Sequence, residues 1–153
     1  MRIATLALTA SMILFAGAAA SASGGSTDAG ADPAGIVKGR QAGMRMSGAV
    51  MGGIKGALDR GDDVKTLTFA AKSLAGWAGA VPGMFPEGSN VAPTEALPTV
   101  WSDPAGFAAR AAAYQAAATK MADAAAAGDK AGVTAAFAEV RASCSDCHST
   151  YKK

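Results

Sequence analysis

The sequence predicts an all-α protein, an antiparallel four-helix bundle, and three observations lead to this fold class. Apolar and small residues recur at spacings of three and four in four segments, as they do on one face of a helix. No segment alternates apolar and polar residues for more than a few positions, so no sheet is expected. Breaks at Gly61, Pro82 and Gly128 separate the segments, and the short first and third connections favour antiparallel neighbours.

Residues 1–22 have the features of a secretory signal peptide. Arg2 gives a positive start, an apolar run follows, and Ala20-Ser21-Ala22 is an A-x-A-like cleavage site. An uncleaved anchor is the alternative, although the apolar run is shorter than a typical membrane-spanning helix. Residues 23–33, rich in Gly, Ser, Ala and Asp, predict a flexible leader before one folded domain at residues 34–153. Export predicts a periplasmic protein with no stable membrane insertion after cleavage.

The first helix is expected from about Pro33 to Arg60. Its apolar face is formed by Ile36, Met44, Ser47, Met51, Ile54 and Leu58. Arg40 falls on the same face, one turn before Met44. Several glycines weaken this helix intrinsically, so its stability must come from packing.

The second helix is expected from about Asp63 to Ala80, where Pro82 stops it. Its stripe is formed by Val64, Leu67, Leu74 and Trp77. Residues 82–102 contain four prolines and predict a loop that is long for a compact domain. We therefore expect this loop to pack against the core or to have a role of its own, with Phe85 and Trp101 as its anchors.

The third helix is expected to begin after a cap at Ser102 or Asp103, with Pro104 in its first turn, and to end at Gly128. The fourth helix follows a cap at Asp129. Its stripe continues through Val133, Phe137, Val140, Cys144 and Cys147. The two thiols therefore point toward the other helices, and His148 lies one turn after Cys144 on nearly the same face.

The segment from Cys144 to His148 reads C-x-x-C-H and contains the only two cysteines and the only histidine of the chain. This motif is typical of c-type haem attachment, in which two thiols bond the porphyrin and the adjacent imidazole binds the iron. A structural zinc site is an alternative, but such a site needs four Cys or His ligands and this chain has three. A thioredoxin-like pair would need a βαβ pattern nearby. A plain disulfide would close a very short loop, which stabilises little.

Composition and charge narrow the classes of function. The formal net charge of +2 and the lack of a basic run argue against nucleic-acid binding. Because the sole histidine is assigned to iron, the sequence offers no acid–base dyad and no nucleophile–base pair. We therefore do not expect an enzyme.

The motif at the extreme C-terminus of a four-helix chain resembles the class II c-type cytochromes, the cytochrome c′ family. The resemblance runs from about Ile36 to Lys153. It also rests on Arg40-Gln41, on Phe85-Pro86-Glu87-Gly88, on Trp101-Ser102-Asp103 with Phe107, and on Tyr151-Lys152. It implies one haem c per chain in the bundle core, bonded through Cys144 and Cys147, with His148 as the fifth ligand of the iron.

The resemblance also implies that Arg40 pairs with a haem propionate, with Gln41 near the same edge and Lys152 by the proximal face. The residues support part of this, because a buried propionate needs a partner and arginine offers it a fork of donors. The alternative is that the side chain of Arg40 snorkels to solvent.

Met44 occupies the position that looks onto the distal face of the haem in this family. Its thioether is a competent soft ligand, yet methionine is also an adaptable core filler, and the two interpretations are evenly balanced. Met46, two residues on, points away. Met51, two turns along, is expected to face another part of the bundle.

The resulting hypothesis is an exported monohaem cytochrome that transfers electrons to periplasmic redox partner proteins, with Met44 as a sixth ligand. The alternative is a high-spin cytochrome that binds NO or CO with Met44 unligated. A third hypothesis is a haem-free thiol protein that uses Cys144 and Cys147. The family commonly forms homodimers through the first two helices, and the small residues of the first helix are compatible with either a dimer or a monomer.

Overall fold

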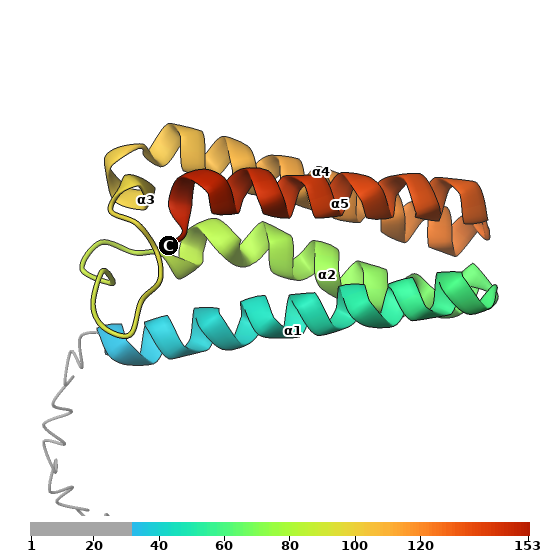
Figure 1. The fold of residues 1–153 in the computed structure, drawn as a ribbon, viewed down its shortest axis with the longest axis horizontal. Helices are drawn as coiled ribbons and strands as arrows, with labels where there is room; N and C mark the ends of the chain where they lie inside the picture. Colours follow the sequence, from blue (N-terminus) through green and yellow to red (C-terminus); the bar gives the residue numbers. More distant parts are fainter. Residues whose placement is uncertain (1–31) are drawn as a thin grey trace, which may run out of the picture.

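Four long helices run up, down, up and down in the computed structural model, which describes residues 32–153 (Figure 1). They are α1 (Pro33–Arg60), α2 (Thr68–Ala80), α4 (Pro104–Ala127) and α5 (Lys130–Tyr151). The start of α1 and the C-terminus of the chain lie at the same end of the bundle, beside the long α2–α4 connection. The predicted signal peptide and residues 23–31 of the predicted leader lie outside the described residues.

The predicted helix ends coincide with caps. Asp103 accepts a hydrogen bond from the backbone N–H of Gly106 and so caps α4, and Asp129 caps α5 in the same way. Gly61 and Gly128 end α1 and α4 with φ of 76° at both residues, a left-handed conformation that glycine adopts without strain. Asp32, which the sequence assigned to the leader, is the N-cap of α1.

The two connections on either side of α2 contain short helices that the sequence did not predict. A 3₁₀ helix, η1 (Val64–Leu67), precedes α2, and a second one, η2 (Val81–Met84), follows it. Asp63 caps η1, and the hydroxyl of Thr68 donates to the carbonyl of Lys65, so local side-chain hydrogen bonds hold this tighter turn. The loop predicted at residues 82–102 therefore begins with most of η2 and ends with a short helical turn, α3 (Thr99–Ser102).

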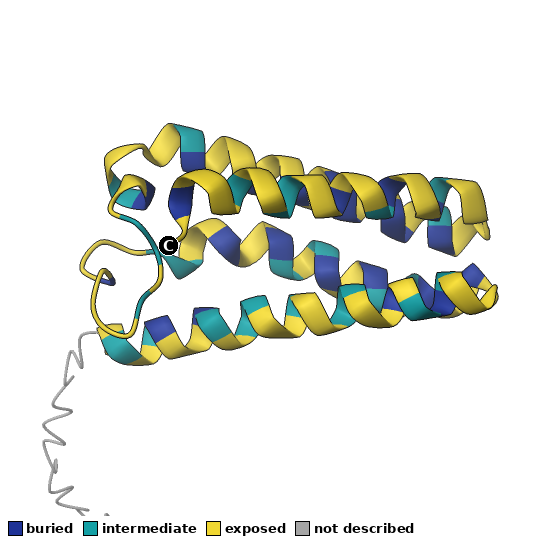
Figure 2. Ribbon diagram, in the orientation of Figure 1, coloured by how far each residue is buried: buried dark blue, intermediate teal, exposed yellow. Residues whose placement is uncertain are grey.

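Packing differs between the two sides of the bundle. Helix α4 packs closely against both α2 and α5, whereas α1 packs mainly against α2 and hardly touches α5. Small side chains on the inner face of α4 allow the close approach, namely Ala111, Ala117, Ala118, Ala122 and Ala125. The buried positions form stripes along the inward faces of the helices (Figure 2).

Two details of α1 differ from the predicted stripe. Val37 is fully buried, whereas its predicted neighbour Ile36 is half-buried, so the inner face is rotated slightly at the start of the helix. Phe85 and Trp101 pack against the core as the sequence indicated, with their ring centroids 6.2 Å apart. Between residues 32 and 153, no helix combines the length and the apolar character that crossing a membrane would require.

Candidate functional site

A cavity of about 560 Å³ lies between α1 and α5, at the end of the bundle that holds the long loop. Its volume falls in the usual range for cofactor sites, about 300–1,000 Å³. Apolar side chains from α3, α4 and the loop segments form much of its lining, namely Val81, Phe85, Val100, Phe107 and Ala111. The cavity thus lies where α1 and α5 do not pack against each other.

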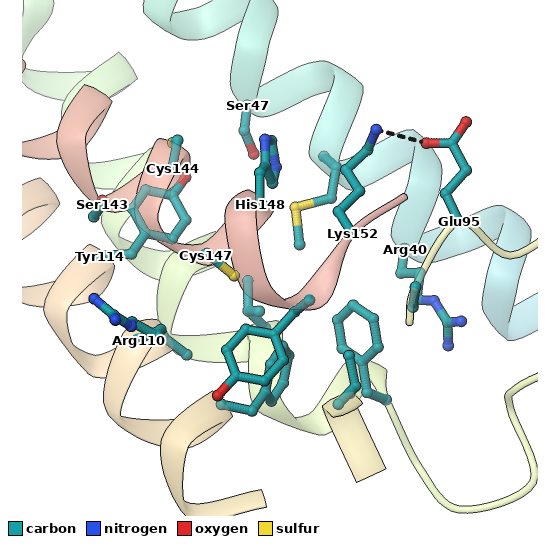
Figure 3. Close-up of a pocket in the computed structure, with 18 of the residues that line it drawn as sticks. Arg40, Ser47, Glu95, Arg110, Tyr114, Ser143, Cys144, Cys147, His148 and Lys152 are labelled. Carbon is teal, nitrogen blue, oxygen red and sulfur yellow. Dashed lines mark ion pairs between the residues drawn. The ribbon is translucent and has the colours of Figure 1, made fainter. Parts of the chain in front are cut away.

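Helix α5 brings the three residues of the C-x-x-C-H motif to this cavity. Cys144, Cys147 and His148 all line it, and the close-up shows them following one another along α5 (Figure 3). Both cysteines are half-buried free thiols. Burial raises the pKa of the Cys144 and Cys147 thiols, which keeps them in the neutral form.

The imidazole of His148 is also favoured in its neutral form. Burial lowers the pKa of His148, and the nearby ammonium of Lys152 lowers it further. A neutral imidazole has a free nitrogen lone pair, which is the state that binds a metal ion. Among residues 32–153, no group of three or more His, Cys, Asp and Glu side chains is arranged to hold a metal ion.

Helix α1 forms the opposite wall. Met44 and Gln41 line the cavity and are half-buried, and their contacts with a haem stay predictions. Met46 is 68% exposed and points away, as predicted. The prediction for Met51 is wrong, because Met51 lines the same cavity as Met44. Seven residues span nearly two helical turns, so these two side chains return to almost the same face.

Arg40 is one of the two buried polar or charged residues among residues 32–153, with only 3% of its surface exposed, so it does not snorkel to solvent. Its guanidinium donates from Nη1 to Ser89 Oγ at 2.8 Å and from Nη2 to Thr94 Oγ1 at 2.7 Å. It also donates to the backbone carbonyls of Met84 and Ser89. The guanidinium lies 4.4 Å from the ring centroid of Phe85. The pairing of Arg40 with a propionate stays a prediction.

Burial lowers the pKa of Arg40, yet a guanidinium remains charged in proteins. No carboxylate among residues 32–153 forms an ion pair with it. Only the neutral hydrogen-bond acceptors and the aromatic ring therefore offset the free energy lost when this charge is removed from water. A carboxylate brought by a bound group would add the charged partner that these residues do not supply.

Sequence reasoning missed several residues of the site. Tyr114 and Arg110 reach it from α4, and Glu95 with Thr94 reaches it from the loop. Burial raises the pKa of Tyr114 to about 12, despite a hydrogen bond with Ser47 that lowers it. Tyr114 follows Phe107 and Ala111 at helical spacing, so its place on the inner face of α4 could have been found from the sequence. Thr94 and Glu95 lie in a loop without a periodic pattern, so the sequence could not identify them as site residues.

The residues present fit a haem. The cavity is bounded by the apolar residues above, two thiols and one imidazole line its α5 wall, and a thioether lies on the α1 wall. These groups match the donor set of a covalently attached haem, with His148 and Met44 as the candidate axial ligands on facing walls. The guanidinium of Arg40, which has no ion-pair partner between residues 32 and 153, lies in the same lining.

Comparisons with known proteins agree with this geometry. The family described as Cytochrome C′ matches residues 35–152. Cytochrome c-556 of Agrobacterium tumefaciens is 34% identical over 122 residues, which cover 78% of this chain and 98% of that protein. Cytochrome c-554 of Cereibacter sphaeroides is 37% identical over 95 residues, so the match covers 60% of this chain but only 61% of that relative. A solved nitric oxide complex of a mutant of cytochrome c prime from Alcaligenes xylosoxidans aligns with a TM-score of 0.74 at 30% identity, over 80% of this chain and 98% of that one.

The predicted fold class is confirmed, and so is the cofactor, because proteins of this family bind a single covalent c-type haem. Haem attachment is therefore favoured over the zinc, thioredoxin-like and plain disulfide interpretations of the C-x-x-C-H motif, and over a haem-free thiol protein. The chain belongs to the cytochrome c′ family, the class II c-type cytochromes, and is a haem-binding electron-transfer or gas-binding cytochrome.

Proposed function

We propose that this chain is an exported monohaem cytochrome that carries electrons between protein partners in the periplasm. The observation that carries the proposal is that Met44 on α1 and His148 on α5 line one cavity from its two walls. A thioether and an imidazole on the two faces of a haem leave no open coordination position. Electron transfer without ligand exchange is the chemistry that such a site serves best.

Each residue has a distinct task in this proposal. Cys144 and Cys147 would hold the porphyrin to α5, and the neutral imidazole of His148 would supply a nitrogen ligand to the iron. Met44 approaches from α1. The haem supplies a redox-active iron, whose reduction potential Met/His ligation raises. The aromatic and aliphatic part of the lining lowers the polarity on that side of the haem, which strengthens the effect of charges near it.

Binding of a small gas is the second candidate, with Met44 as an unligated distal residue. The observation that favours it is that the similar solved cytochrome c prime from Alcaligenes xylosoxidans is a nitric oxide complex. In this case Met44 and Met51 would form an apolar distal surface that admits uncharged NO or CO. The two candidates differ only in whether the sulfur of Met44 binds the iron.

Absorption spectra of the haem-loaded protein separate the two candidates. The oxidised, reduced and CO-treated reduced forms would be compared for the natural protein, for Met44→Leu and for the control Met46→Leu, whose side chain is 68% exposed. Electron transfer predicts a narrow low-spin α band that CO does not change, and that only Met44→Leu converts to a CO-reactive form. A broad high-spin spectrum that responds to CO in all three proteins would instead establish the gas-binding candidate.

The proposal extends to location and partners. It places the protein in the periplasm with redox partner proteins, and it assigns the chain no enzymatic reaction. The proposal also includes a homodimer through α1 and α2. Two exposed apolar side chains support it, Phe69 on α2, which is 83% exposed, and Met46 on α1. Sedimentation velocity of the haem-loaded protein tests the dimer, and a monomer at all concentrations would refute it.

A further inference from the structure

The two candidate axial residues lie on helices that hardly touch each other. Met44 is on α1 and His148 is on α5, and the direct packing of these helices is negligible. An axial bond forms only if both side chains are held within about 0.5 Å of the productive geometry. Some other part of the molecule must therefore fix the separation of α1 and α5 at the haem end.

The α2–α4 loop is attached to α1 by buried hydrogen bonds. Arg40 donates to the Ser89 hydroxyl and carbonyl at 2.8 and 2.9 Å, and to the Thr94 hydroxyl at 2.7 Å. Ser89 is only 1% exposed, so this attachment is shielded from water. The next residue, Gln41, donates from Nε2 to the carbonyl of Pro93 at 2.9 Å. One turn of α1, immediately before Met44, thus holds the loop.

The same loop is attached to the end of α5, just after His148. The backbone N–H of Leu97 donates to the Tyr151 carbonyl, and the N–H of Lys153 donates to the Glu95 carbonyl, both at 2.9 Å. Lys152 Nζ forms an ion pair with Glu95 Oε2 at 3.0 Å, which the close-up marks (Figure 3). The loop therefore reaches from one wall of the cavity to the other.

Thr94 joins the two attachments. Its hydroxyl oxygen accepts from Arg40 Nη2 at 2.7 Å and from the backbone N–H of Ala96 at 3.1 Å. Ala96 in turn pairs with Lys152 in an isolated antiparallel bridge. The two hydrogen bonds of this bridge are made by Glu95 and Leu97, on either side of Ala96. Thr94 is thus bonded to Arg40 on α1 and, within the loop, to the short segment that is bonded to the end of α5.

We propose that residues 89–97 form a strap that sets the spacing of α1 and α5, and that Thr94 is the positioning residue that decides how closely Met44 approaches the iron held by His148. The proposal rests on the proposed haem function and deepens it. In this proposal Thr94 acts through its hydrogen bond with Arg40 and the backbone of α1, and it is assigned no bond to the iron or to a gas. Loss of its hydroxyl leaves one donor of a buried guanidinium without its acceptor, so the turn before Met44 must shift to find another.

The test compares haem-loaded Thr94→Val, which keeps the size of the side chain but removes the hydroxyl, with Thr94→Ser, which restores it. Thr66→Val is the matched control, because the Thr66 hydroxyl makes one exposed hydrogen bond, to the Asp63 carbonyl. It lies in the α1–α2 connection, at the opposite end of the bundle. The measurements are the low-spin fraction in the absorption spectrum and the rate of CO association. For Thr94→Val alone, we expect a change of about three- to tenfold in one of two quantities. One is the ratio of low-spin protein, with Met44 bound to iron, to high-spin protein, and the other is the rate of CO association.

The outcomes distinguish this proposal from the proposed function. The spectrum of the natural protein decides between electron transfer and gas binding, whereas the strap is judged only by the difference that Thr94→Val makes. An unchanged spectrum and CO rate in Thr94→Val would overturn the strap even if its melting temperature fell. An equal change in Thr66→Val would overturn it as well.

A second variant covers the case in which Thr94→Val fails to retain haem. Glu95→Gln weakens only the α5 attachment, at an exposed ion pair, and should fold normally. The strap predicts a smaller change of the same two observables in the same direction. No change in Glu95→Gln, together with loss of haem in Thr94→Val, would mean that Thr94 serves stability alone and would overturn the proposal.

Discussion

The side of the bundle formed by α2, α4 and α5 and the side formed by α1 and α5 are built on different principles. On the first side, small side chains of α4 let the helices approach closely, and Met121, Val133 and Val140 are completely buried. On the second side, half-buried methionines and cysteines face a cavity. One half of the core is thus made of side chains, and the other half is completed by the haem.

This difference explains the composition of the chain. An alanine-rich α4 has high helix propensity and a narrow profile, so it stabilises a three-helix unit without the cofactor. The glycines of α1 lower its propensity, and α1 gains few contacts with α5 in return. Helix α1 should therefore depend on the haem far more than α4 does.

The largest effect is expected from removing both attachment points with Cys144→Ser and Cys147→Ser in one variant. Covalent haem should disappear completely from the mass spectrum of the protein. Hydrogen exchange should then accelerate along the cavity-facing part of α1, because that wall loses its packing partner, while α4 and α5 stay protected at their far ends. Equal protection of α1 with and without haem would contradict the comparison.

A second prediction compares two methionines, one on each side of the bundle. Met121→Ala should cost about 2–5 kcal/mol of the free energy of unfolding, because the Met121 side chain is fully buried among packed helices. Met51→Ala should cost about 1 kcal/mol, since Met51 is half-buried at the cavity wall. Denaturant unfolding of the haem-loaded variants measures both. Equal losses would show that the two sides are equally well packed.

Much of the fold could be predicted from local sequence signals. Asp103, Pro104 and Gly128 bound α4 as expected, because capping depends on neighbouring residues only. The division of the second helix into η1 and α2 was not predicted, because apolar spacings cannot separate a 3₁₀ turn from an α-helical one over four residues. The rotation that buries Val37 instead of Ile36 depends on how α1 meets its neighbours.

The site was predictable where one motif contains its chemistry and unpredictable where it depends on the loop. Cys144, Cys147 and His148 lie together because they are close in sequence. The partners of Arg40 are 44 to 54 residues away, in a loop without periodicity, so Ser89 and Thr94 could not be identified beforehand. Burial of Arg40 was indicated by its place on the apolar face, but its acceptors were not.

A third prediction concerns a close contact between α1 and α2, at Gly43 and Trp77. A Cβ added at Gly43 would overlap the ring of Trp77, whereas a Cβ at Gly52 would meet nothing. Gly43→Ala should therefore destabilise the protein by about 1–3 kcal/mol, and Gly52→Ala should stabilise it by about 0.5–1 kcal/mol through helix propensity. Thermal unfolding followed by circular dichroism measures both. Stabilisation by Gly43→Ala would mean that α1 and α2 are not fixed against each other at this point.

The smallest predicted effect concerns Asp103, which ties the start of α4 to the end of α5. The carboxylate accepts hydrogen bonds from the Tyr151 hydroxyl at 2.8 Å and from the backbone N–H of Gly106 at 3.0 Å, and these lower its pKa below the ordinary value. A carboxyl with a lowered pKa in the folded state contributes stability that is complete above its unfolded pKa, about 3.9, and is lost as the pH falls through the folded pKa.

Asp103→Asn keeps a good N-cap but removes this titration. The difference in unfolding free energy between the natural protein and Asp103→Asn should therefore shrink as the pH falls from about 5 toward 2. Asp129→Asn is the matched control, since Asp129 caps α5 through Gly132 without a tyrosine hydroxyl on its carboxylate. The difference from the natural protein should stay nearly constant with pH for Asp129→Asn. If the two variants instead show the same change over this pH range, the Tyr151 hydrogen bond adds nothing to the stability of this end of the bundle in acid. The contact between α4 and α5 there would then depend on apolar packing alone.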